Sequence, residues 1–133
     1  MSDIGILAEG NTLQEAFEEG ARAALAVMFD LDTIDEVETV EIKAEAPDVE
    51  LLFVEVLNEV LSIQGVKELA LKRIKTTELR ENNRFTYKGA AFGEKLNLKK
   101  HHVRTEVKGA TYSALKHAIT GRGTHTLKCI LDV

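Results

Sequence analysis

The sequence predicts an α+β protein, a two-layer sandwich in which two helices pack on one face of a mainly antiparallel sheet. Two apolar stripes with helical spacing lie in the first half of the chain, and a short strand precedes them. Alternating apolar and polar residues, which are typical of strands, fill most of the second half. With 133 residues and no linker or repeat, we expect a single domain over residues 1–133 with one core.

Both expected helices have recognisable starts. Thr12 can cap a helix at about residues 12–29, and Glu15 can reach back to complete a capping box. Asp48 can cap a second helix, which Gly65 ends. The apolar stripe of the first helix comprises Leu13, Ala16, Phe17, Gly20, Ala21, Ala24, Leu25 and Met28. That of the second comprises Val49, Leu52, Phe53, Val56, Leu57, Val60 and Leu61.

The strands are predicted from alternation with a period of two residues. Asn82-Asn83 and Gly121-Arg122-Gly123 have the residues of hairpin turns, and residues 93–104 form a polar, basic connection. The expected strands are Asp3–Ala8, Val37–Ala46, Leu69–Leu79, Arg84–Phe92, Glu106–His117 and Thr124–Asp132.

The two halves of the chain carry opposite charge. Residues 1–66 hold sixteen Asp and Glu against two Lys and Arg, a balance of −14, whereas residues 67–133 hold fifteen basic and six acidic residues, a balance of +9. Such a division either makes a dipolar surface that steers a charged partner or lets the halves pair across a sheet. We expect the second arrangement in a compact domain.

Several functional classes receive no support from the sequence. Cys129 lies in an apolar run and has no partner for an internal disulfide, so we expect a core residue in a reducing cytoplasm. No secretory signal or run of about 18 apolar residues indicates secretion or membrane insertion. Gly121-x-Gly123 lacks the wider pattern of a nucleotide-binding loop, and Ser113 lacks an assigned base. We therefore expect no bound nucleotide and no nucleophilic catalysis by Ser113 or Cys129.

Residues 101–112 combine titratable groups of both signs with a strand-like alternation. In a strand, Glu106, Lys108, Ala110 and Tyr112 would share one face, so that an acid, a base and a phenol line up. The alternative is an edge strand with a solvated charged face.

A basic run overlaps this segment, and it suggests contact with a phosphate backbone. The run lacks the interleaved aromatic residues on which bases stack, which weakens a role in RNA binding on its own. Its members are Lys95, Lys99, Lys100, Arg104 and Lys108.

The two ends of the chain both carry carboxylates. If the first and last strands bring their ends together, Asp3, Asp132 and the main-chain carboxylate of Val133 supply oxygen ligands suited to Ca²⁺ or Mg²⁺. Otherwise they are two solvated termini. A zinc site is less favoured, because the four histidines lack the Cys/His spacing of a structural zinc site.

Three separated segments resemble the archease family, whose members activate the GTP-dependent tRNA-splicing RNA ligase. The segments have the expected order and nearly the expected separations, and both helices also fit. They are Ser2-Asp3-Ile4-Gly5-Ile6, His101-x-x-x-x-Glu106-Val107-Lys108-x-x-Thr111-Tyr112 and Ile130-Leu131-Asp132-Val133.

The resemblance implies an α/β sandwich, a divalent metal site of calcium type and no independent catalysis. Asp3 and Asp132 become the expected carboxylate ligands, with the main chain of Val133 as a third ligand. The implied partner is the RNA ligase, which would itself hold GTP and RNA, so contact of this chain with RNA would be indirect or transient.

The resemblance also implies roles for the central motif. Lys108 is expected to contact the ligase or to assist its chemistry, and His101, Glu106 and Tyr112 are counted with it as partner-binding or assisting residues.

This sequence departs from the family pattern at its start. The family usually has a short strand and a His-Thr pair before the aspartate, whereas here Met1 directly precedes Ser2. Either the natural start lies upstream or this member has lost that strand, and we expect an unpaired sheet edge beside Asp3. Gly109 and Ser113 also stand where alanine and often histidine are usual.

The leading hypothesis is a non-enzymatic, metal-binding accessory protein that promotes guanylylation and multiple turnover of the ligase in tRNA splicing and RNA repair. Two alternatives belong to other classes. One is a small metal-dependent hydrolase using Asp3, Asp132 and His101, and the other is an RNA-binding module without catalysis.

Overall fold

The computed structural model describes residues 3–133, apart from the side chain of Ala114, so Ser2 of the first motif lies outside the described residues. Neither helix in this part of the chain is both long and apolar enough to cross a membrane. In chain order the elements are β1 (Asp3–Gly10), α1 (Leu13–Met28), a short 3₁₀ turn (Leu31–Thr33), β2 (Glu38–Ala46), α2 (Val49–Val66), β3 (Leu69–Asn82), β4 (Arg84–Lys95), β5 (Gly109–Ile119) and β6 (His125–Asp132).

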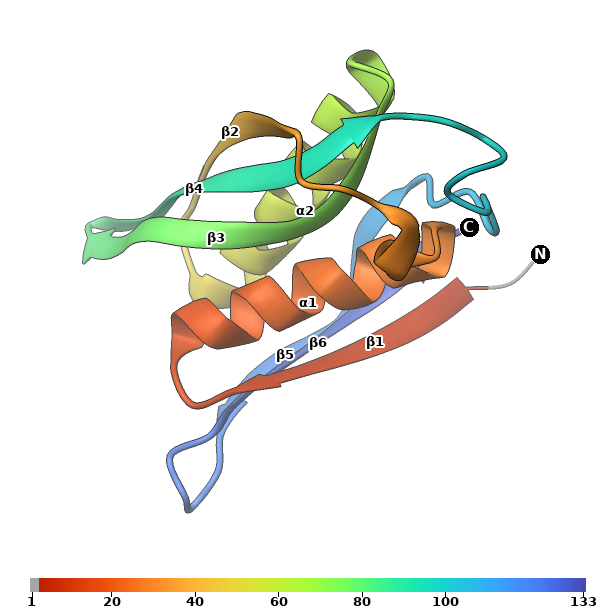
Figure 1. Cartoon of the computed structure of the whole chain (residues 1–133). Coiled ribbons are helices and arrows are strands. Elements are labelled where there is room, and N and C mark those ends of the chain that lie inside the picture. The colour runs from red at the N-terminus through yellow and green to blue at the C-terminus, as the bar shows by residue number, and fades with distance from the viewer. Residues whose placement is uncertain (1–2) are drawn as a thin grey trace.

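The strands form two antiparallel sheets of three strands each, with the orders β1-β6-β5 and β2-β4-β3. Figure 1 shows both helices lying between these sheets. The predicted α+β class is confirmed. The layers differ from the predicted arrangement, because the helices are enclosed by two sheets instead of covering one face of a single sheet.

The sequence of α2 explains this difference. Three consecutive residues, Leu52, Phe53 and Val54, are fully buried. Consecutive residues on a helix point in different directions, so their burial requires packing partners on more than one side of the helix. A sheet on each side satisfies this requirement: α2 packs against β5 of one sheet and β2 of the other, while α1 packs against β1 and β3.

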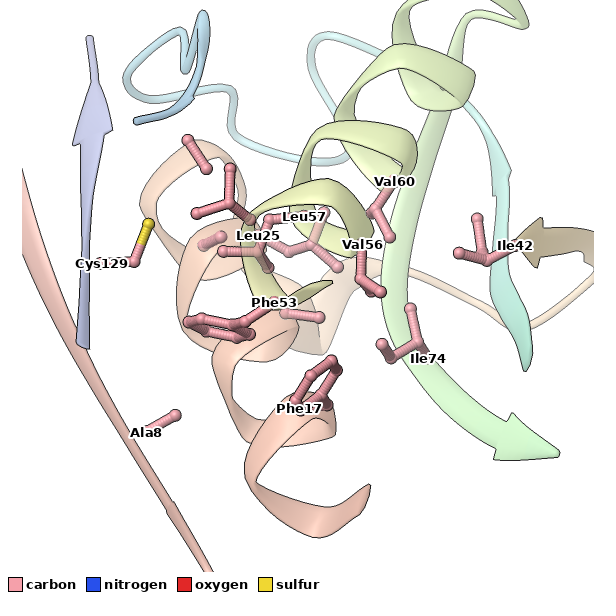
Figure 2. Packing of buried hydrophobic residues seen from close by; sticks show 14 of the residues in the cluster. Ala8, Phe17, Leu25, Ile42, Phe53, Val56, Leu57, Val60, Ile74 and Cys129 are labelled. Atoms are coloured by element: carbon pink, nitrogen blue, oxygen red, sulfur yellow. The ribbon is translucent and has the colours of Figure 1, made fainter. Parts of the chain in front are cut away.

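The core lies where the two helices meet between the sheets (Figure 2). The rings of Phe17 and Phe53 meet edge to face, with centroids 5.4 Å apart. Gly20 permits this approach, since a Cβ atom there would overlap the Phe53 ring. Cys129 is a buried free thiol, as predicted, and burial raises its pKa to about 11.

The predicted starts of both helices are confirmed. The Thr12 side chain accepts a hydrogen bond from the Glu15 amide at 3.1 Å, and the Glu15 carboxylate accepts from the Asn11 amide at 2.8 Å. The Asp48 carboxylate caps α2 by accepting from the Leu51 amide at 2.8 Å. These caps satisfy amides that have no partner within the first helical turn.

The acidic and basic halves of the chain pair with each other. Strand β1 pairs with β6 and β2 pairs with β4, so each sheet joins strands from both halves. An ion pair of 2.8 Å between Arg73 and Glu36 also crosses the division. The charge asymmetry of the sequence is therefore partly neutralised within the fold.

Candidate functional site at the paired chain ends

The register of β1 and β6 places Asp3 directly opposite Asp132. Side chains of opposed residues in an antiparallel pair lie on the same face, with Cβ atoms about 4.5–5.5 Å apart. Ile6 and Leu131 are buried, so the alternation of each strand turns both aspartates to the outer face of the sheet. The chain ends thus converge, as the metal hypothesis requires.

Two further groups join the aspartates at this end. The Lys108 amide donates a hydrogen bond of 2.8 Å to the main-chain oxygen of Asp132, which fixes the segment before β5 beside the end of β6. The side chain of Val133 packs against the core and anchors the terminal residue. Figure 1 shows the start of β1 and the C-terminus at the end of the molecule that also carries the loop between β4 and β5.

Glu106 and Lys108 lie outside the strand in which they were predicted, because β5 begins at Gly109. The amides of Arg104 and Thr105 donate to the carbonyl groups of Met28 and Val27, which draws this segment toward the C-terminal end of α1. Val107 is buried, while Glu106 and Lys108 on either side of it are exposed. The alternation is therefore real, but the predicted strand face shared with Tyr112 is wrong.

The metal hypothesis depends on what surrounds the two aspartate carboxylates. No group among residues 3–133 donates a hydrogen bond or forms an ion pair with the carboxylate of Asp3 or Asp132. Two opposed negative charges without donors favour a cation, and oxygen ligands suit Ca²⁺ or Mg²⁺. No three His, Cys, Asp or Glu side chains of the described chain converge, so the metal hypothesis also requires ligands other than these side chains.

His101 occupies a different environment from the aspartates. Its ring is fully buried, and its Nδ1 atom accepts a hydrogen bond of 3.0 Å from the Asn97 amide. Because Nδ1 is an acceptor, the ring proton sits on Nε2, which donates to Glu94 at 2.9 Å. The structure therefore uses both ring nitrogens of His101 to hold the loop between β4 and β5.

Glu94 organises that loop, and the sequence did not single it out. Its carboxylate accepts hydrogen bonds from the Asp35 amide at 2.8 Å, from Lys100 at 3.0 Å and from His101. These three donors lower the pKa of Glu94 to about 2. The only sequence signal is a glutamate seven residues before a histidine, which is too common a spacing to identify a cluster.

Tyr112, which lies on the edge strand β5, contacts α2. Its hydroxyl donates a hydrogen bond of 2.6 Å to Glu55, which raises the pKa of the phenol. One turn further along α2, the side chain of Asn58 donates to the carbonyl of Ala110 at 3.1 Å and accepts from its amide at 2.7 Å. The helix thus supplies side-chain partners along β5.

The basic run lies mainly in the loop between β4 and β5. Lys99 and Arg104 are exposed, whereas Lys100 forms ion pairs of 2.8 Å with both Asp35 and Glu94. The charge that this loop offers to a partner is therefore smaller than the sequence suggests.

The fold is that of a small α+β protein in which two antiparallel sheets enclose two helices, and the pairing of the first and last strands places Asp3 opposite Asp132. The chain belongs to the archease family, since the Archease protein family (MTH1598/TM1083) matches residues 1–133. The resemblance carried by the three sequence segments is thus confirmed.

Individual relatives agree with this assignment. Protein archease of Sulfolobus acidocaldarius is 36% identical over 132 residues, which cover 99% of this chain and 93% of the relative. Protein archease of Pyrococcus furiosus is 33% identical over 115 residues, covering 86% and 81% of the two chains.

Two solved structures share the fold. The Methanobacterium thermoautotrophicum protein 1598 has a TM-score of 0.85 at 27% identity, covering all of this chain and 94% of the other. A Thermotoga maritima protein described as an archease and possible chaperone has a TM-score of 0.60 at 25% identity, covering 98% and 90%.

Proposed function

We propose that this chain is a non-enzymatic accessory protein of the cytoplasm that activates a GTP-dependent tRNA-splicing RNA ligase. It would promote guanylylation and repeated turnover of the ligase in tRNA splicing and RNA repair. Family membership supports the proposal, as does the description of the Thermotoga maritima relative as a possible chaperone. The observation that carries the proposal is the placement of Asp3 opposite Asp132. The main-chain amide of Lys108 donates a hydrogen bond to the main-chain oxygen of Asp132, so Lys108 lies at the same end.

The residues at the paired ends suggest how assistance would work. Asp3, Asp132 and the terminal carboxylate would hold a divalent cation, calcium being the best fit to these oxygen donors. When bound, such a cation supplies positive charge for phosphate oxygens. Lys108 has an exposed side chain at the same end and would offset charge on the triphosphate in the partner's site.

His101 would act indirectly in this scheme. Its buried ring holds the loop that leads to Lys108, so we assign it to positioning and not to contact with the ligase. The same burial weakens the hydrolase alternative, which needs His101 as a base beside the two aspartates. Glu106 is exposed next to Lys108 on the chain and remains a predicted partner contact, as does Tyr112.

The test is multiple-turnover RNA ligation by the cognate ligase with GTP, with the ligase limiting. We expect the wild-type protein to raise both turnover and the fraction of guanylylated ligase, and Asp132→Asn and Lys108→Gln to abolish the effect. Lys99→Gln, an exposed lysine in the same loop, is the matched control and should retain activity.

Two outcomes would contradict the proposal. If the wild-type protein adds nothing to ligation, the activator role fails. If the protein alone cleaves RNA and Asp132→Asn abolishes cleavage, the hydrolase alternative is favoured, whereas tight binding of RNA without ligase and with a steep salt dependence favours the RNA-binding module.

A further inference from the structure

Two histidines meet at the other end of the sheet formed by β1, β6 and β5. Nε2 of His117, on β5, lies 3.0 Å from Nδ1 of His125, on β6. The ring planes differ by 6° and the centroids are 5.3 Å apart, about the largest separation that a 3.0 Å contact between ring nitrogens allows. The rings therefore meet edge to edge, with the nitrogen lone-pair directions pointing along the line between them.

The strand register explains why these two rings meet. His117 is opposite Leu127, and His125 is opposite Ile119, so the histidines occupy diagonal positions on one face. That face is the inner one, because Leu127 is fully buried. Both histidines are only partly exposed and lie on either side of the hairpin that contains Gly123.

The surroundings of His117 favour its uncharged form. Burial and the adjacent His125 lower the pKa of His117, and the Glu50 carboxylate in the first turn of α2 opposes this shift. A neutral imidazole is the form that binds metals. The negative charge of Glu50 also favours a cation at this position.

We propose that His117 and His125 form a binding site for a borderline divalent ion of the zinc type. Imidazole nitrogens are preferred ligands of such ions, and no carboxylate need take part directly. Tetrahedral zinc with bonds of about 2.0–2.1 Å would need the two nitrogens a few tenths of an ångström further apart and each ring turned by about 35°, so that both lone pairs point at an ion beside the line that joins the nitrogens. Water would complete the coordination.

The proton balance of binding is simple. In the free protein one of the two facing nitrogens carries the shared proton. On binding, that ring adopts its other neutral tautomer, with the proton on the distal nitrogen, so that both facing lone pairs reach the ion. No net proton is released when both rings begin in their neutral forms.

The inference is independent of the proposed function, since the two sites offer different donor atoms at opposite ends of β6. Oxygen donors at Asp132 suit Ca²⁺, whereas nitrogen donors at His125 suit Zn²⁺. Zinc would join β5 to β6 across their hairpin and stabilise the folded state by mass action.

The experiment is titration of the metal-free, tag-free full chain with Zn²⁺ by calorimetry, together with thermal unfolding with and without Zn²⁺. We expect one equivalent to bind and the unfolding temperature to rise. His117→Gln and His125→Gln should each raise the dissociation constant about tenfold or more and remove the thermal shift. Excess Ca²⁺ should leave binding unchanged.

The matched control is His102→Asn, which removes an exposed imidazole from a residue whose φ of 50° asparagine tolerates. It should bind Zn²⁺ as the wild type does. Unfolding of the zinc-free variants shows whether each one is folded before titration. The proposal is overturned if the wild type binds no zinc, if both His→Gln variants keep wild-type affinity while folded, or if Ca²⁺ displaces the zinc.

Discussion

Two carboxylate clusters at the same end of the molecule differ in how fully their oxygens are used. Glu94 accepts hydrogen bonds from an amide, a lysine and a histidine. Asp3 and Asp132 face each other, and nothing within residues 3–133 donates to their carboxylates. A carboxylate with its acceptor positions filled stabilises a local structure, whereas an opposed pair without donors retains the capacity to bind a cation.

The largest effect on stability should follow from removing His101, which donates a hydrogen bond to Glu94. His101→Ala deletes a fully buried ring together with its hydrogen bonds to Asn97 and Glu94. We expect the free energy of unfolding to fall by about 2–4 kcal/mol, as for other large-to-small changes at buried sites. Urea denaturation measures it. His102→Asn should change it by less than about 0.5 kcal/mol, and equal values for both variants would mean that His101 does not anchor the loop.

The second prediction concerns the facing pair Asp3 and Asp132. At a Ca²⁺ concentration about 100 times the dissociation constant, binding should add about 2.7 kcal/mol to the free energy of unfolding of the wild type. Asp132→Asn should abolish this gain while leaving the metal-free protein at least as stable as the wild type, because it removes a repulsion and no hydrogen bond. Glu106→Gln makes the same charge change at an exposed residue and should keep the calcium response. An unchanged response in Asp132→Asn would separate calcium binding from this pair.

The third prediction concerns the acid sensitivity of the cluster around Glu94. The pKa of Glu94 is lowered from 4.5 to about 2, so between these values the unfolded state binds more protons than the folded state. The stabilisation from Glu94 is therefore complete above about pH 5 and is lost as the pH falls toward 2. In Glu94→Gln, the free energy of unfolding should change less between pH 5 and pH 3 than in the wild type.

A control for the acid experiment is Glu41→Gln, which alters a carboxylate on β2 whose ion pair with Lys43 is well exposed. It should follow the wild-type pH dependence. If Glu94→Gln also follows the wild-type pH dependence, the cluster around Glu94 does not account for the acid sensitivity.

The smallest effect should come from Tyr112, which belongs to neither cluster. Tyr112→Phe removes one hydrogen bond to Glu55 at an exposed position, so we expect a loss of less than about 1 kcal/mol in the free energy of unfolding. Glu55→Gln should return the raised pKa of the Tyr112 phenol toward its usual value, as followed by ultraviolet titration. A phenol pKa unaltered by this substitution would exclude Glu55 as the cause.

Features encoded within a few residues were predictable from the sequence. Thr12 and Asp48 identified the starts of α1 and α2, because a capping side chain bonds to an amide three residues away. The turn at Asn83, with φ of 62°, was predictable for the same reason, since asparagine tolerates this conformation. The pairing of Asp3 with Asp132 is not a local feature, and the sequence left it conditional on the first and last strands being neighbours.

Features that depend on distant contacts were not predictable. Whether one sheet or two form depends on which strands share a helix, and alternation within a strand carries no such information. The strand predicted from Glu106 was displaced by bonds to Met28 and Val27, about 80 residues earlier in the chain. The His117–His125 contact depended on register across a hairpin; their symmetric placement around Gly121-Arg122-Gly123 is the signal that would have found it.

The two hydrogen bonds from the Asn58 side chain to Ala110 have a consequence for association. A single amide occupies both the N–H and the C=O that an edge strand would otherwise offer to an incoming strand. Asn58 therefore blocks β-augmentation at this point of β5. Because β1 is the other outer strand of the same sheet, a partner that binds by strand addition would be directed to β1, next to Asp3.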